Sequence, residues 1–135
     1  MRLFVDSSAW TALYNPRDKY RLQARDGMQA LAGQDAEFVT TDYVLDETLT
    51  NLQTGYMHTA AERFGVWVQK QANVRVVHVS ESIWADAWEM FRRSDDKEFS
   101  FTDCISFVVM QQQDLHDAFT FDHHFEQMGF RPWPR

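Results

Sequence analysis

Residues 3–8 read Leu3-Phe4-Val5-Asp6-Ser7-Ser8, and this stretch carries the first evidence for the fold. Three consecutive apolar residues are typical of a short strand that is buried on both faces of a parallel sheet. An aspartate follows the run directly, and one of the two serines can cap a short helix over residues 9–14, which Asn15-Pro16 ends. The stretch therefore predicts a buried strand that leads at once into a helix.

The rest of the chain alternates between predicted strands and helices. Further strands are predicted at 38–41, 74–79 and 118–121, and the second of these is the clearest because its core is β-branched. Helices are predicted at 17–32, 42–55, 57–71, 80–91, 102–113 and 123–127. This alternation predicts an α/β sandwich with a mostly parallel sheet, in one domain that spans residues 1–135.

The composition is that of a folded domain. Of the 135 residues 44% are hydrophobic and 24% are charged, which excludes a disordered, collagenous or low-complexity chain. The single cysteine, Cys104, excludes an intramolecular disulfide and suits a reducing compartment. No apolar run approaches the roughly 18 residues of a membrane span, and the apolar N-terminal stretch is too short for a signal peptide. We therefore expect a soluble, cytoplasmic protein without membrane contact.

The net charge of −7 comes from 20 acidic and 13 basic residues. Acidity argues against nucleic-acid binding, because phosphate contacts need Lys and Arg. It does not exclude an enzyme that holds metal ions with carboxylates, since the ions reverse the local sign of the charge. The positions of the acids therefore decide between these interpretations.

Four acids fall where a site is expected. Asp6 and Asp122 directly follow the first and the last predicted strand, Asp103 lies in the first turn of a helix, and Glu47 lies in the helix after the second strand. Sites in parallel sheets lie beyond the carboxyl ends of the strands, so these carboxylates can gather in one cleft. Four like charges require protons or cations, and Mg²⁺ or Mn²⁺ prefers such oxygen ligands. Such ions activate water in phosphodiester hydrolysis.

Each acid also has a purely structural interpretation. Asp6 and Asp122 can cap the helices that follow them, and Asp103 completes a capping-box-like pattern that begins at Ser100. Glu47 lies beside Asp46 on a half-exposed helix, where a carboxylate is usually solvated. The four-part pattern, rather than any single acid, points to a metal site.

The chain resembles PIN-domain proteins, and specifically the VapC toxins of bacterial toxin–antitoxin pairs. Four stretches carry the resemblance, which covers nearly the whole chain: residues 3–8 (LFVDSS), 40–47 (TTDYVLDE), 100–106 (SFTDCIS) and 119–125 (FTFDHHF). The resemblance implies a three-layer α/β/α sandwich and an endoribonuclease that depends on Mg²⁺ or Mn²⁺. The residues that match the metal ligands of the family are Asp6, Glu47, Asp103 and Asp122.

The resemblance also implies supporting residues and partners. Ser7 matches a hydroxyl residue that commonly supports the site, and Ser106, one turn beyond Asp103, could face the same cleft. The implied partners are an RNA substrate, a VapB-like antitoxin and a second copy of the chain in a homodimer. The alternative functions are a non-toxic PIN-domain nuclease in RNA processing and a catalytically silent module that binds RNA or protein.

Other residues offer weaker functional interpretations. His123 could orient substrate or shuttle a proton, and His124 is the weaker candidate of this pair. Cys104 fits a small apolar position better than a nucleophile, because the adjacent acid would raise the pKa of its thiol. The stripe of Trp84, Trp88 and Phe91 is typical of a core or dimer-facing surface rather than of a base-stacking one.

Two groups of basic residues, 17–25 and 92–97, are most simply solvated, but they could hold phosphates if they flank the cleft. The register of the second acidic stretch is a separate question, because Asp46 and Glu47 are adjacent. With Leu45, Leu49 and Leu52 expected on the buried face, periodicity does not choose between the two acids. The resemblance favours Glu47.

Overall fold

The computed structural model describes residues 1–135, which form five strands and seven helices. In chain order the elements are β1 (Arg2–Val5), α1 (Ser7–Tyr14), α2 (Arg21–Leu31), β2 (Glu37–Thr41), α3 (Asp42–Thr54), α4 (His58–Lys70), β3 (Val74–Val77), α5 (Glu81–Arg93), α6 (Phe101–Gln112), β4 (Asp117–Phe119), α7 (His124–Gln127) and β5 (Arg131–Trp133). None of the helices is long and apolar enough to cross a membrane.

All five strands form one sheet in the order β3-β2-β1-β4-β5, and every neighbouring pair is parallel. The prediction of a mostly parallel sheet is therefore confirmed in a stricter form. The first strand lies at the centre, between β2 and β4, and its Leu3-Phe4-Val5 run is fully buried. Burial on both faces explains why this strand shows no alternation of polar and apolar residues.

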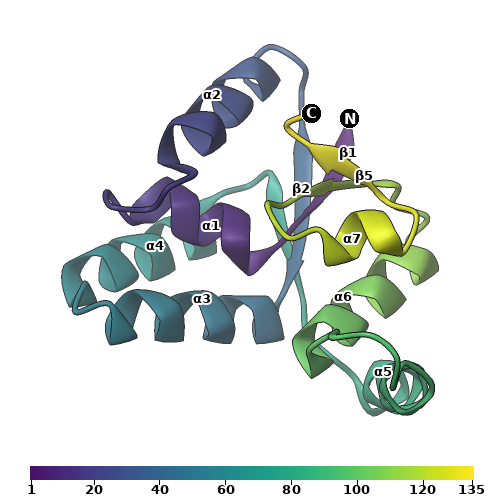
Figure 1. Ribbon diagram of the computed structural model, residues 1–135. Coiled ribbons are helices and arrows are strands. Elements are labelled where there is room, and N and C mark those ends of the chain that lie inside the picture. The colour runs from purple at the N-terminus through teal and green to yellow at the C-terminus, as the bar shows by residue number, and fades with distance from the viewer.

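Helices cover both faces of the sheet, so the predicted three-layer α/β/α sandwich is confirmed. Figure 1 shows α1 to α4 on one side of the sheet and α5 to α7 on the other. Aromatic contacts join elements both across and within the layers: Phe4 of β1 stacks on Phe125 of α7, and Trp10 of α1 packs on Phe64 of α4. A single cluster of buried apolar side chains runs through the sandwich.

The fifth strand escapes sequence analysis. Arg131–Trp133 contains Pro132 and has only three residues, so no strand pattern identifies it. It pairs with β4 as the last strand of the sheet, and an edge strand tolerates proline because one side of its backbone needs no partner. The strand exists because of its tertiary pairing rather than its intrinsic propensity.

The second helix begins at Arg21 instead of residue 17. The side chain of Asp18 accepts a hydrogen bond from the backbone N–H of Tyr20, and the Asn15 side chain accepts one from that of Arg17. Asparagine and aspartate side chains that bond the backbone two residues on favour turns over helix. Residues 15–20 therefore form a turn, which is named the α1–α2 turn below.

The caps of two helices and the buried face of α3 complete the local description. Asp6 caps α1, as its structural interpretation predicts, whereas neither serine does, and Thr41 caps α3 by accepting a hydrogen bond from the Val44 backbone N–H. The residues that α3 buries are Val44, Thr48 and Leu52, whereas Leu49 is exposed. Thr48 fits in the core because its hydroxyl donates to the Val44 carbonyl.

Candidate active site

Asp6 lies at the carboxyl end of the central strand. Its backbone N–H donates to the Phe119 carbonyl at 3.1 Å, which extends the contact between β1 and β4 by one residue. Its side chain is buried, and Oδ2 accepts hydrogen bonds from the Ser8 backbone N–H at 3.3 Å, the Ser8 hydroxyl at 2.7 Å and the Thr120 hydroxyl at 3.0 Å. These donors fix the orientation of the carboxylate.

The same two hydroxyls tie Asp6 to Asp122. The Ser8 hydroxyl accepts from the Phe121 backbone N–H at 2.9 Å, and the Thr120 hydroxyl accepts from the Asp122 backbone N–H at 3.0 Å. The end of β1 and the segment after β4 are therefore joined through side chains, which holds the two aspartates near each other. Sequence analysis missed both Ser8 and Thr120, although hydroxyl residues beside acids at two strand ends were a visible signal.

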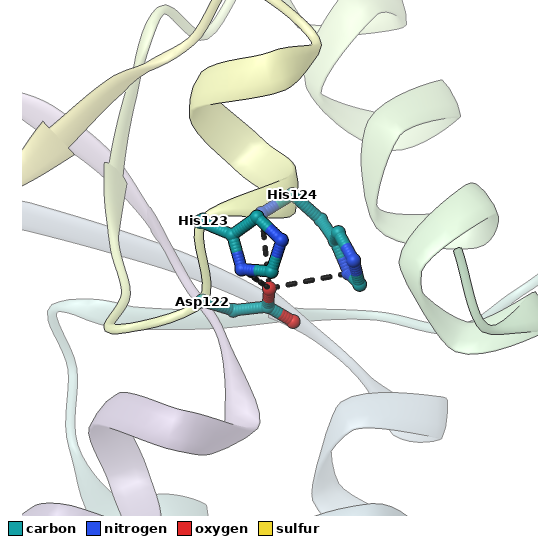
Figure 2. Close-up of side chains that lie close together, drawn as sticks. All are labelled: Asp122, His123 and His124. Carbon is teal, nitrogen blue, oxygen red and sulfur yellow. Dashed lines mark hydrogen bonds and ion pairs between the residues drawn. The ribbon is translucent and has the colours of Figure 1, made fainter. Parts of the chain in front are cut away.

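His124 connects Asp122 with Asp103. Its Nδ1 atom lies 3.2 Å from Asp122 Oδ1 and 3.3 Å from Asp103 Oδ2, and its backbone N–H donates to Asp122 Oδ1 at 2.9 Å. Figure 2 shows that a single Asp122 oxygen, Oδ1, faces the His124 ring, the His124 backbone nitrogen and the His123 ring, while the other oxygen faces neither histidine. Asp122, His123 and His124 also offer ligand atoms that all lie within 4.8 Å of one another.

Asp103 and Glu47 complete the acidic group from α6 and α3. Asp103 forms the expected capping box, in which its Oδ2 accepts from the Ser100 backbone N–H at 3.1 Å. The Ser7 hydroxyl donates to Glu47 Oε1. Asp46, by contrast, is exposed.

Each of the four carboxylates has one bonded oxygen and one free oxygen. The bonded atoms are Asp6 Oδ2, Glu47 Oε1, Asp103 Oδ2 and Asp122 Oδ1. The second oxygen of each accepts no hydrogen bond, yet the only fully buried side-chain polar atom without a partner is the Thr11 hydroxyl. The free oxygens are therefore not fully enclosed by the protein, and no protein donor competes with a cation for them.

Burial, with added repulsion from neighbouring acids, raises the pKa values of Asp6 and Asp103. Burial, with added repulsion from Asp103 and Asp122, raises the pKa of Asp6 to about 7, although hydrogen bonds from Ser8 and Thr120 oppose the rise. The pKa of Asp103 is raised as well, chiefly by burial. A bound cation would offset this repulsion and favour the ionised carboxylates. The donor set therefore fits a hard, oxygen-binding divalent metal ion.

The supporting candidates fall in different places. Ser7 contacts Glu47, whereas the Ser106 hydroxyl donates to the Thr102 carbonyl inside α6 and makes no contact with the acids. The His124 side chain is 14% exposed and bonded between two acids, whereas that of His123 is 73% exposed and lies 3.8 Å from Asp122. The structure thus brings His124, the weaker candidate, into the acidic group.

Two further features of this region are a cleft beside the acids and the cysteine that follows Asp103. A cleft of about 440 Å³ is lined by Ser7, Ser8 and Asp122 and also by Lys19 and Asn51. Burial, together with the charge of Asp103, raises the pKa of the Cys104 thiol to about 11. Cys104 is also fully buried, so the expectation that it occupies a small apolar position of the core is confirmed.

The fold and the acidic group define a class of protein. The PIN domain family model matches residues 3–131, so the chain belongs to the PIN domain family. Within it, the chain is similar to the "23S rRNA-specific endonuclease VapC20" of Mycobacterium tuberculosis, with 35% identity over 128 residues that cover 95% of each protein. A "VapC ribonuclease" of Archaeoglobus fulgidus is 26% identical over 117 residues, covering 85% of this chain and 74% of that protein.

Solved structures give the same assignment. The crystal structure of M. tuberculosis VapC20, described as a Sarcin-Ricin loop cleaving toxin, matches with a TM-score of 0.87, at 34% identity and 95% coverage of both chains. VapBC2 from Rickettsia felis, bound to a DNA fragment from its promoter, matches with a TM-score of 0.70 over 98% of this chain and 97% of that one. At 9% identity this second likeness concerns the fold alone. The chain is an endoribonuclease of the VapC toxin type.

Proposed function

We propose that Asp6, Glu47, Asp103 and Asp122 hold Mg²⁺ or Mn²⁺ and that the protein uses the ion to hydrolyse RNA phosphodiester bonds. The observation that supports this most strongly is that each of the four carboxylates has one oxygen without a protein hydrogen-bond donor. Hydrogen bonds on the other oxygen orient each ligand in advance, so little reorganisation accompanies ion binding. This ligand set is all oxygen, which suits Mg²⁺ or Mn²⁺ better than zinc.

The residues of the chain divide the work of the reaction. A bound divalent ion supplies an activated water and charge stabilisation for the phosphoryl oxygens. Ser8 and Thr120 orient Asp6, and His124 keeps Asp103 and Asp122 at a fixed separation. Ser7 orients Glu47 from the start of α1. Lys19, which lines the cleft, offers a cation to a substrate phosphate.

We infer a ribosomal RNA substrate from the similarity to VapC20. The relative described as specific for 23S rRNA and as cleaving the Sarcin-Ricin loop is similar over 95% of this chain. Such a substrate would place the activity in the cytoplasm, where ribosomes are found.

Two protein partners belong to the same proposal. A VapB-like antitoxin would occupy the cleft, and an arginine is the side chain best suited to reach the carboxylates because its fork matches their geometry. A homodimer would bury the exposed face of α5, on which Trp84, Trp88 and Phe91 stack in a row. Contiguous exposed aromatic surface of this kind is typical of a protein interface.

The test is cleavage of purified 23S rRNA, with the RNA ends mapped by primer extension. We expect a discrete cut with Mn²⁺ or Mg²⁺, no cut in EDTA, and recovery when the metal is restored. Full activity in EDTA would contradict the metal mechanism, and cleavage confined to other RNAs would contradict the ribosomal substrate. Growth arrest that is relieved by the product of the adjacent gene would separate a toxin from a non-toxic processing nuclease.

A further inference from the structure

The basic side chains divide into two groups. Seven of the thirteen Lys and Arg side chains form ion pairs with carboxylates, so their charge is locally neutralised. Six have no acidic partner, and four of these lie on or face the α1–α2 turn. The six are Arg17, Lys19, Arg21, Arg63, Lys70 and Arg75. The chain has a net charge of −7, yet four unpaired cations lie together on one surface, so this surface differs in charge from the chain as a whole.

The α1–α2 turn separates two hollows. On one side, Lys19 lines the cleft of the active site, where its ammonium lies over the Tyr20 ring, 5.0 Å from its centroid. On the other side, Arg21 and Arg63 line a groove of about 660 Å³, which we name the cationic groove, and none of its lining residues is acidic. A chain of phosphates leaving the active site would meet cations on both sides of this turn.

Arg17 links the two turns that border the cationic groove. Its guanidinium donates to the Gly55 carbonyl at 3.2 Å, which joins the α1–α2 turn to the turn between α3 and α4. Figure 1 shows both turns at the same end of the molecule. Asn51, in the last turns of α3, lines the cleft, and Tyr56, just beyond the end of α3, lines the groove, so both hollows adjoin the same end of this helix.

Tyr56 occupies an unusual position at the rim of the groove. It follows the C-cap of α3, where the backbone N–H groups of Tyr56 and Met57 donate to the carbonyls of Gln53 and Leu52. This arrangement favours glycine, because it requires a positive φ, and Tyr56 has φ 60°. The side chain is nevertheless 96% exposed. A large aromatic ring there costs backbone energy and contributes nothing to the core.

We propose that the cationic groove is an RNA subsite, in which Arg21 and Arg63 contact backbone phosphates beside the scissile bond and Tyr56 stacks on an unpaired base. Cations that follow the backbone, together with an exposed aromatic ring that accepts a base, are the two components of single-strand binding. This inference rests on the proposed RNA-cleaving function and extends the substrate contacts of that site beyond the carboxylates.

Binding without cleavage tests the subsite. A fluorescein-labelled single-stranded RNA of about twelve nucleotides is titrated in EDTA and followed by fluorescence anisotropy. We expect the double variant Arg21→Ala/Arg63→Ala to bind roughly tenfold more weakly and to lose about 1.4 units from the slope of log Kd against log salt, the loss of two phosphate contacts. The control is Lys70→Ala/Arg75→Ala, which removes the two other unpaired cations and should change Kd less than about twofold.

Tyr56 provides a variant that separates binding from folding. Tyr56→Gly should raise the melting temperature or leave it unchanged, because glycine favours a positive φ, while Kd for the RNA rises about fivefold or more. Tyr56→Phe should bind as the wild type does. Equal RNA affinity in the wild type, the groove variants and the control would overturn the subsite, as would an undetectable RNA complex of the wild type.

The remaining outcomes distinguish an RNA subsite from a protein-docking surface, and test the subsite separately from the proposed nuclease function. Groove variants that lose antitoxin binding while their Kd for RNA is unchanged would make the groove a protein-docking surface and overturn the proposal. Cleavage in Mn²⁺ is measured separately on the same preparations. A wild type that binds through the groove but cuts no RNA would contradict the proposed nuclease function while supporting the subsite.

Discussion

The acidic site and the cationic groove lie on opposite sides of one turn and are built in opposite ways. In the site, every carboxylate has one oxygen fixed by a hydrogen bond, and the donors come from strand ends and helix starts. In the groove, Arg21 and Arg63 have no partner, and Tyr56 is almost fully exposed. A small ion needs ligands that are oriented in advance, whereas a flexible polymer is well served by side chains that can adapt.

The substitution with the largest expected effect removes a carboxylate from the acidic site and leaves the cationic groove unchanged. Asp6→Asn should lower the cleavage rate more than about a hundredfold, because it removes a charged ligand where even supporting residues matter ten- to a hundredfold. Binding of RNA in EDTA should stay within about threefold of the wild type, since the groove is unchanged. Gel-based cleavage assays measure the first effect and anisotropy the second; an active Asp6→Asn would remove this carboxylate from the mechanism.

The same substitution should stabilise the metal-free protein. Because the folded-state pKa of Asp6 is raised from 3.8 to about 7, the unfolded chain releases this proton first and stability falls as the pH rises between these values. At pH 8 the gain of Asp6→Asn is at most about 4 kcal/mol, from about 1.4 kcal/mol for each pKa unit. Urea unfolding in EDTA should show the gain at pH 8 and none below pH ~4; equal stability at pH 8 would contradict the assigned burial.

A smaller contrast tests the register of α3. Glu47→Gln should slow cleavage more than about tenfold, because it removes charge from a ligand oriented by Ser7, whereas Asp46→Asn should stay within about threefold of the wild type. The pair is matched, since the two positions are adjacent on one helix and each substitution replaces a carboxylate with an amide. The reverse ranking in single-turnover assays would mean that Asp46 reaches the ion.

The smallest expected effect compares the two neighbouring histidines. His124→Ala should raise the Mn²⁺ concentration for half-maximal cleavage by about tenfold, because Asp103 and Asp122 lose the group between them. Saturating Mn²⁺ should restore most of the rate, as expected of a positioning residue, and His124→Asn should restore part of the affinity. His123→Ala should resemble the wild type; a larger effect at His123 would make the exposed imidazole a substrate contact.

The sequence was sufficient for the regular parts of the fold. The buried strand at 3–5, the alternation of strands and helices, and the placement of acids at strand ends can be predicted from short stretches of sequence. Apolar runs and helix-capping residues each leave a signal within a few residues. The edge strand at 131–133 was missed, since only its pairing with β4 makes it a strand. Sequence analysis predicts helix from residue 17, but residues 15–20 form the α1–α2 turn. The hydrogen bond from the Tyr20 backbone N–H to the Asp18 side chain outweighs the helical propensity of this segment.

The contacts within the site depend on long-range packing. That Ser8 and Thr120 share the Asp6 carboxylate, or that His124 rather than His123 lies between two acids, requires residues more than twenty positions apart to meet. The cationic groove was beyond sequence analysis for the same reason. Basic residues at 17–25 were visible, but the lack of acidic partners at Arg17, Lys19 and Arg21, and the position of Arg63 on the same groove as Arg21, are properties of the folded chain.

The most direct test of the central claim is a Mn²⁺ titration of the purified protein at pH 8, followed by calorimetry. We expect wild-type protein to bind Mn²⁺ and to gain thermal stability with added metal, because the free carboxylate oxygens form the ion site. Asp6→Asn and Asp103→Asn should lose most of this affinity, whereas Asp46→Asn and Arg21→Ala/Arg63→Ala should keep it. Equal Mn²⁺ binding by the wild type and the first two variants, or none by the wild type, would contradict the account.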